Sequence, residues 1–149
     1  MKAFSTVALF VIVVAGCASA RKTQLTDAAI EYKAVTRGRH LNVNYKNDTL
    51  SWYSGRGMAT GGNQRILTAE EKESLFRLLD KVQLEDLNKL KSPTNARMYD
   101  GAMIADIKII TKDSTYESSS FDHGKPPAEI AEFVSQFLKF TGDETYYGN

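Results

Sequence analysis

The stretch LNVNYKNDTLSWYS constrains the fold more than any other part of this sequence, because apolar and polar residues alternate on both sides of Asn47-Asp48. Alternation with a period of two is typical of a half-buried β-strand. A two-residue turn at Asn47-Asp48 would place Tyr45 opposite Leu50 and Val43 opposite Trp52 on one face. The sequence therefore predicts an antiparallel hairpin with one face in a core.

Other segments extend this pattern to a complete domain. Residues 30–34 and 103–109 also alternate, and a more polar strand is expected over 115–121 after a turn at 112–114. Thr68 and Glu71 form a capping box for one helix, and Pro126-Pro127 precede another. We predict an α+β fold, a mainly antiparallel sheet of about five strands in the order βββαββα, with two helices packed on one face. The apolar stripes expected to meet the sheet are Leu75, Phe76, Leu79 and Val82, and Ile130, Phe133, Val134, Phe137 and Leu138.

The first residues have the layout of a secretory signal peptide. Lys2 precedes the apolar run VALFVIVVA, which is shorter than the roughly 20 residues of a membrane-spanning helix. The run ends in Val14-Ala15-Gly16-Cys17, and Cys17 is the only cysteine. We predict a signal peptide over 1–16, a lipidated Cys17 with a flexible tether over 17–27, a single domain over 28–142 and a polar tail over 143–149.

Charge gives no support for nucleic-acid binding. Only Lys2 of the 19 basic residues lies in the predicted signal peptide, which leaves 18 basic against 18 acidic residues. The basic residues are interspersed with acidic ones rather than clustered, so we expect no nucleic-acid partner.

We expect a monomer held at a membrane by its acyl chains.

The sequence carries no strong signature of an enzyme or of a cofactor. The glycines of SGRGMATGGNQR, positions 54–65, lack the Lys-Ser or Lys-Thr pair of a phosphate-binding loop, and we expect a mobile loop there. Two histidines, His40 and His123, and no paired metal-ligand motif argue against a metal site. No GxSxG elbow is present. We expect no metal, no cofactor and no catalytic residue.

Two segments, ARMYDGA and SFDHGKPP, contain the candidate binding residues. A hairpin turn near Asp113 would bring these segments together at one end of the sheet. The candidate binding patch consists of Arg97, Tyr99, Asp100, Asp122 and His123. Three interpretations remain open: a ligand-binding cluster, acid–base chemistry by Asp122 and His123, or turn residues with Asp122 capping the helix that begins at the prolines.

These motifs resemble a family of small bacterial lipoproteins without an assigned activity. The similarity covers the lipobox ending at Cys17, the early strand IEYKAVTRG, and the segments LKSPTNARMYDGA and SFDHGKPPAEI. It implies diacylglyceryl transfer to the Cys17 sulfur, cleavage before it and acylation of the new amino terminus. The order of strands and helices is also similar to that of emfourin-type inhibitors of metalloproteases, which are cytoplasmic and lack a lipobox.

We therefore expect a lipid-anchored protein of the bacterial cell envelope that acts as a binding module for an envelope protein or a small molecule. The outer membrane is favoured, because Ala18 stands where an aspartate would mark inner-membrane retention in some bacteria. The alternatives are a structural envelope component, an inhibitor-like module, or an enzyme that uses Asp122 and His123. The triplets at 48–50 and 113–115 resemble acceptor sites for O-glycosylation.

Overall fold

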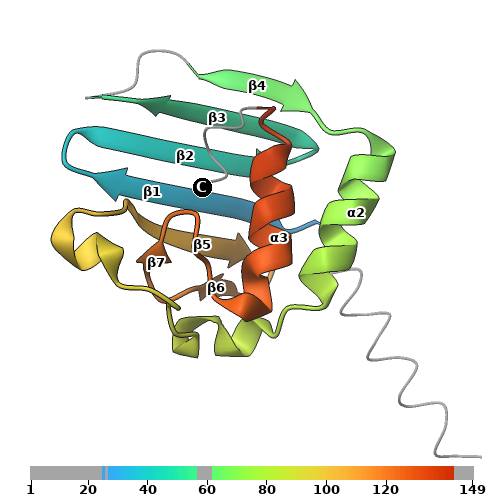
Figure 1. Cartoon of the computed structure of the whole chain (residues 1–149). Helices are drawn as coiled ribbons and strands as arrows, with labels where there is room; N and C mark the ends of the chain where they lie inside the picture. The colour runs from blue at the N-terminus through green and yellow to red at the C-terminus, as the bar shows by residue number, and fades with distance from the viewer. Residues whose placement is uncertain (1–24, 26, 57–61, 143–149) are drawn as a thin grey trace, which may run out of the picture.

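The computed structural model of the 149-residue chain describes residues 25, 27–56 and 62–142 (Figure 1). The predicted signal peptide, Cys17, the tether before Leu25 and the tail 143–149 lie outside these residues, as does part of the glycine-rich segment. Within the described chain, no helix is both long enough and apolar enough to cross a lipid bilayer.

A largely antiparallel sheet forms the centre of the domain, in the order β4-β3-β2-β1-β5-β6, with the short β7 paired to β5. Two α-helices and two 3-10 helices complete the part of the chain that the structure describes. The strands are β1 (Ala29–Thr36), β2 (Arg39–Lys46), β3 (Thr49–Gly55), β4 (Asn63–Ile66), β5 (Ile104–Ile110), β6 (Thr115–Glu117) and β7 (Phe121–Asp122), and the helices are α2 (Ala69–Asp80), η1 (Leu84–Lys89), η2 (Ala96–Tyr99) and α3 (Ala128–Lys139).

The predicted hairpin is confirmed in its register. Tyr45 pairs with Leu50 and Val43 pairs with Trp52. Asn47 and Asp48 adopt positive φ angles of 48° and 64°. Both angles are those of a type I′ turn, whose twist matches that of the strands it joins.

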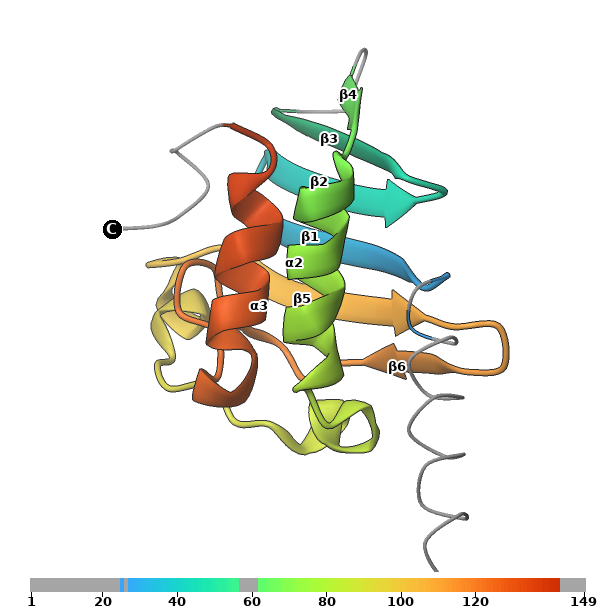
Figure 2. The ribbon, with the colours of Figure 1, turned by 90° about the vertical axis from the view of Figure 1, so that its right-hand side faces the viewer.

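The two α-helices lie side by side on one face of the sheet, as Figure 2 shows. Both predicted apolar stripes supply buried residues to the core, with Leu75, Leu79 and Phe137 fully buried. Thr68 and Glu71 form the predicted capping box at the start of α2. The α+β class and the packing of the helices on one face are thus confirmed.

The described residues form seven strands, where alternation predicted about five. The polar sequence of β4, NQRI, pairs with β3 at the end of the segment expected to be a loop. The expected strand over 115–121 is split into β6 and β7 at Ser118 and Ser119. The Ser119 amide and hydroxyl donate to the carbonyl oxygens of Leu87 and Asn88 in η1, so the chain leaves β5 there.

Candidate functional site

The carboxylate of Asp122 organises one end of the sheet. Asp122 lies on β7, and its side chain is 1% exposed. Its Oδ2 accepts from the Thr94 hydroxyl and from the Ala96 amide, each at 2.6 Å. Its Oδ1 accepts from the Arg97 amide at 3.1 Å and from Arg97 Nη1 at 2.9 Å. The carboxylate thus accepts from the first two amides of η2. Helix η2 comes before β7 in the chain, so this contact joins segments that are distant in sequence.

These contacts settle what Asp122 does in the fold. Of the three interpretations left open, the one in which Asp122 helps to cap the final helix is wrong, because Pro127 is the N-cap of α3 and no side chain caps that helix. Burial alone would raise the pKa of Asp122, but the hydrogen bonds from Thr94 and Arg97 lower this pKa to about 2. Asp122 is therefore ionised at neutral pH, and its charge is neutralised by Arg97 inside the domain.

Arg97 faces inward together with Asp122. Its side chain is 13% exposed, and Nη1 also donates to the Thr94 carbonyl at 2.8 Å and to the Ser92 hydroxyl at 3.1 Å. The structure therefore brings Arg97 and Asp122 together as predicted, but as a buried pair rather than as part of an exposed patch. The segment 92–97 is held against β7 by this pair.

His123 has a different partner. Its Nδ1 lies 2.7 Å from the hydroxyl oxygen of Tyr32, whose side chain is completely buried. Burial raises the pKa of Tyr32, with a further contribution from the charge of Asp106. Burial, and then the positive charge of Arg39, lower the pKa of His123. A protonated Tyr32 thus contacts a neutral His123. His123 is not among the donors to the Asp122 carboxylate, which are Thr94, Ala96 and Arg97.

Tyr99 and Asp100, the remaining predicted residues, lie on the outer side of the same end. Tyr99 is 85% exposed, and its neighbour Met98 is 71% exposed. Asp100 ends η2 with a left-handed φ of 57° and lies 3.6 Å from Arg37 in the turn between β1 and β2. The ion pair links η2 to the tip of the first hairpin.

Two more exposed apolar side chains lie at this end, and the sequence prediction missed them. Val35 on β1 and Ile104 on β5 are Cα partners and are 39% and 44% exposed. Both side chains face away from the helices, because they alternate with the buried residues of their strands. Apolar residues at these polar positions of the alternation were the sequence signal that could have revealed them. We call Val35, Met98, Tyr99 and Ile104 the far-end patch, because Val35 stands next to the last residue of β1 whereas Leu25 precedes its first residue.

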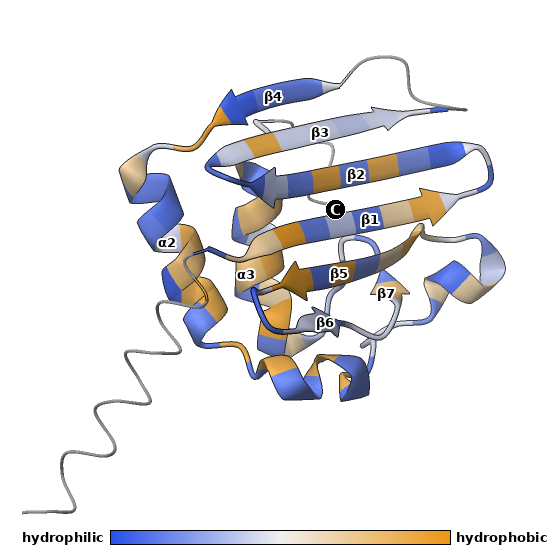
Figure 3. Ribbon diagram, turned by 180° about the vertical axis from the view of Figure 1, so that it is seen from behind, coloured by the Kyte–Doolittle hydropathy of each residue, from blue (hydrophilic) through white to orange (hydrophobic). Residues whose placement is uncertain are grey.

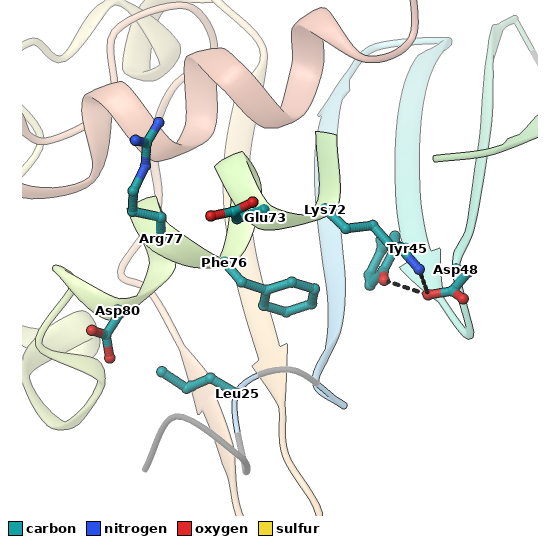
Figure 4. Close-up of a pocket in the computed structure, with 8 residues that line it drawn as sticks. All are labelled: Leu25, Tyr45, Asp48, Lys72, Glu73, Phe76, Arg77 and Asp80. Carbon is teal, nitrogen blue, oxygen red and sulfur yellow. Dashed lines mark hydrogen bonds and ion pairs between the residues drawn. The ribbon is translucent and has the colours of Figure 1, made fainter. Parts of the chain in front are cut away.

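A pocket of about 460 Å³ lies at the opposite, near end of the sheet (Figure 4). Its apolar side is formed by Leu25, Tyr45 and Phe76, and the two rings meet edge to face at 5.6 Å. Asp48 closes one side, where Lys72 Nζ lies 2.9 Å from its carboxylate and Tyr45 donates to it at 3.2 Å. The sequence did not predict this pocket, because its residues come from three separate segments.

The titrating groups of the described residues do not gather into a metal site. No group of three or more His, Cys, Asp or Glu side chains in this part of the chain is placed to hold a metal ion. Comparison with known proteins adds no assignment, since neither the family models nor the curated proteins give a match to this sequence.

Proposed function

We propose that this chain is a lipid-anchored protein of the bacterial cell envelope whose domain binds a partner protein through the far-end patch. The lipobox supplies the anchor at Cys17, and the outer membrane is the favoured location. The observation that carries the proposal is the exposure of Met98 and Tyr99 on a helix that is fixed from beneath by the buried pair of Asp122 and Arg97.

The composition of the far-end patch is that of an interaction surface. Four of the five large apolar side chains exposed among the described residues belong to it, and the fifth, Ile66, lies on the edge strand β4. Tyrosine and methionine are enriched where proteins bind one another, and the cross-strand pair of Val35 and Ile104 adds exposed apolar groups at the same end of the sheet. The ion pair of Arg37 with Asp100 adds polar groups beside the patch.

Rigidity favours binding at this end. Four hydrogen bonds to Asp122 hold the start of η2, so Met98 and Tyr99 project from a turn that is already ordered before a partner arrives. A preorganised surface loses less conformational entropy on association. Burying the charge of Asp122 costs free energy that an apolar residue would not cost. We infer that this cost is tolerated because the ordered loop presents its outer side chains to a partner.

The position of the patch fits a domain tethered at its other end. Leu25, the described residue nearest to Cys17 in the chain, precedes the first residue of β1, and Val35 of the patch stands next to the last residue of β1. The eight residues of β1 span about 26 Å. A domain tethered before Leu25 would therefore present the patch away from its point of attachment.

The same contacts weigh against the enzymatic alternative. The oxygens of Asp122 are directed at Thr94, Ala96 and Arg97, and His123 is engaged by a buried tyrosine. A general base must reach the proton that it abstracts from a substrate. The buried carboxylate is held by the scaffold instead.

Lipid attachment is tested with a clickable fatty acid in cells that make the full chain or the Cys17→Ala variant. We expect label in the natural chain and none in the variant, because the thioether needs the Cys17 sulfur. Equal label in both chains would exclude anchoring at Cys17.

Partner binding is tested by placing a photoreactive amino acid at position 99 of the full chain, with position 66 as the matched control. Both positions carry exposed apolar or aromatic side chains, at 85% and 74% exposure. Illumination in intact cells should give a discrete cross-linked product from position 99 and none from position 66. Identical products from both positions, or none from position 99, would contradict the proposal.

A further inference from the structure

The far end of the sheet carries an excess of positive charge, although the described part of the chain is neutral as a whole. The sequence has 19 basic and 18 acidic residues, of which three and two lie outside the described part, so 16 of each sign remain. The two signs are interspersed along the sequence. The excess at the far end therefore comes from the fold, which brings separate segments together.

One row of cross-strand partners defines this end of the sheet. Gly55 on β3 pairs with His40 on β2, and His40 pairs with Val35 on β1. Val35 pairs with Ile104 on β5, and Ile104 pairs with Asp122 on β7. With about 4.8 Å between strands, the row is about 19 Å long. A single protein–protein contact of standard size, about 800 Å² on each partner, is wide enough to cover it.

Four exposed basic side chains border this row, namely Arg37, Arg39, Arg56 and Lys125. Arg39 and Arg56 are each next in the chain to a member of the row, and Arg37 lies in the turn between β1 and β2. Lys125 forms a β-bridge with Asp122. In Figure 3, seen from behind, the turn between β1 and β2 and the end of β3 lie at the same side of the sheet. We call these four basic residues the basic rim.

Acidic side chains do not neutralise the basic rim. Within the described chain, Arg37 lies 3.6 Å from the carboxylate of Asp100, and the other three form no ion pair. Asp122 is buried and already neutralised. Burial, and then the charge of Arg39, lower the pKa of His123, so the positive potential of the rim extends to that ring. The exposed charge bordering the row is thus four positive groups against one negative.

We propose that the partner of the far-end patch has an acidic surface, with carboxylates placed around an apolar centre. The basic rim would contact the carboxylates, and Met98 and Tyr99 would pack into the apolar centre. Arginine, tyrosine and methionine are all enriched at protein–protein contacts. The inference rests on the partner binding proposed above and specifies the chemistry of that partner. Complementary charge acts mainly on the rate of association and on specificity, so it adds selectivity to an apolar contact.

An anionic membrane and a nucleic acid fit this end less well than a protein does. A domain tethered before Leu25 presents the far end away from its point of attachment, and therefore away from the membrane that would hold the anchor. A nucleic acid gains its affinity from many phosphate contacts. The basic rim is instead interrupted by the exposed side chains of Met98 and Tyr99 and by the carboxylate of Asp100.

The test uses the full chain with a photoreactive amino acid at position 99, and combines this label with charge variants. The test variant is Arg39→Gln/Arg56→Gln. The matched control is Lys46→Gln/Lys112→Gln, which removes the same charge from exposed residues at the near end of the sheet. A thermal melt of each purified variant establishes that it is folded.

In intact cells, we expect the test variant to give at least about fivefold less cross-linked protein than the natural chain, because both removed charges steer association. The control should give the same yield as the natural chain. In isolated envelopes, raising the salt from about 0.1 M to about 1 M shortens the Debye length from about 10 Å to about 3 Å, and should lower the yield from the natural chain as well. Mass spectrometry should locate the cross-link in a protein segment rich in Asp and Glu.

The acidic partner is overturned if the natural chain gives a product whose yield is unchanged in the test variant, or equally reduced in the control. A cross-link to lipid, to nucleic acid or to a protein segment without acidic residues would overturn it too. If the test variant does not fold, a yield from the natural chain that is independent of salt has the same consequence. In each of these cases a product still forms, whereas no product from the natural chain would contradict the proposed partner binding itself.

Discussion

The two ends of β1 differ in which groups are buried and which are exposed. At the near end, the rings of Tyr45 and Phe76 pack together and the charges of Asp48 and Lys72 lie outside them. At the far end, the charge of Asp122 is buried while apolar side chains are exposed. The near end follows the ordinary rule for a soluble domain, whereas the far end departs from it. Such departures are expected at functional positions, and this one is the basis of the proposed partner binding.

The largest effect expected from this difference is that of Asp122→Ala. The variant leaves the guanidinium of Arg97 without its counter-charge and the amides of Ala96 and Arg97 without an acceptor. We expect a loss of about 3 kcal/mol in the free energy of unfolding, measured by urea titration. Asp100→Asn is the matched control, and should cost less than about 0.5 kcal/mol because asparagine tolerates the left-handed φ of this position and the ion pair with Arg37 is exposed. Equal losses in the two variants would show that Asp122 does not organise the far end.

We expect Asp122 and His123 at the far end to be the main cause of the loss of folding free energy at acidic pH. The folded state holds the pKa of Asp122 at about 2, below the value of about 3.9 in an unfolded chain. The unfolded state therefore binds the proton first, and stability present above about pH 5 is lost as the pH falls towards 2. The pKa of His123 is also lowered, so its neutral form favours folding and stability begins to fall below about pH 6.5.

Urea titrations at a series of pH values measure this dependence. In Asp122→Ala, the fall in stability between about pH 5 and 2 should be shallower, because the group that binds a proton on unfolding has been removed. In His123→Gln, the fall that begins below about pH 6.5 should be reduced. Unchanged profiles in both variants would place the acid-sensitive groups elsewhere.

Sequence alone predicts the regular parts of this fold because their causes are local. The hairpin register follows from alternation around Asn47-Asp48, and the start of α2 follows from the spacing of Thr68 and Glu71. Strand β4 has no such pattern. It is positioned by Arg65, which donates to the Glu71 carboxylate at 2.7 and 2.8 Å and to the Phe140 carbonyl at 2.8 Å.

The candidate site was predicted only in part for the same reason. Sequence reasoning brought the segments of Arg97 and Asp122 together, since both flank the hairpin of β5 and β6. It could not assign their side chains to the interior, because the donors to Asp122 lie 25 to 28 residues earlier in the chain. Because the amides of Ala96 and Arg97 turn inward to donate to that carboxylate, the next two side chains, Met98 and Tyr99, are exposed to solvent.

The central claim is that Met98 and Tyr99 at the far end contribute nothing to the core of the domain, which is what leaves them available to the proposed partner. The measurement that tests it most directly is the free energy of unfolding of the Met98→Ser/Tyr99→Ser double variant, compared with the natural chain in the same urea titration. The account predicts a change within about 0.5 kcal/mol, because neither side chain is buried. A loss above about 2 kcal/mol would contradict it, since these side chains would then belong to the core.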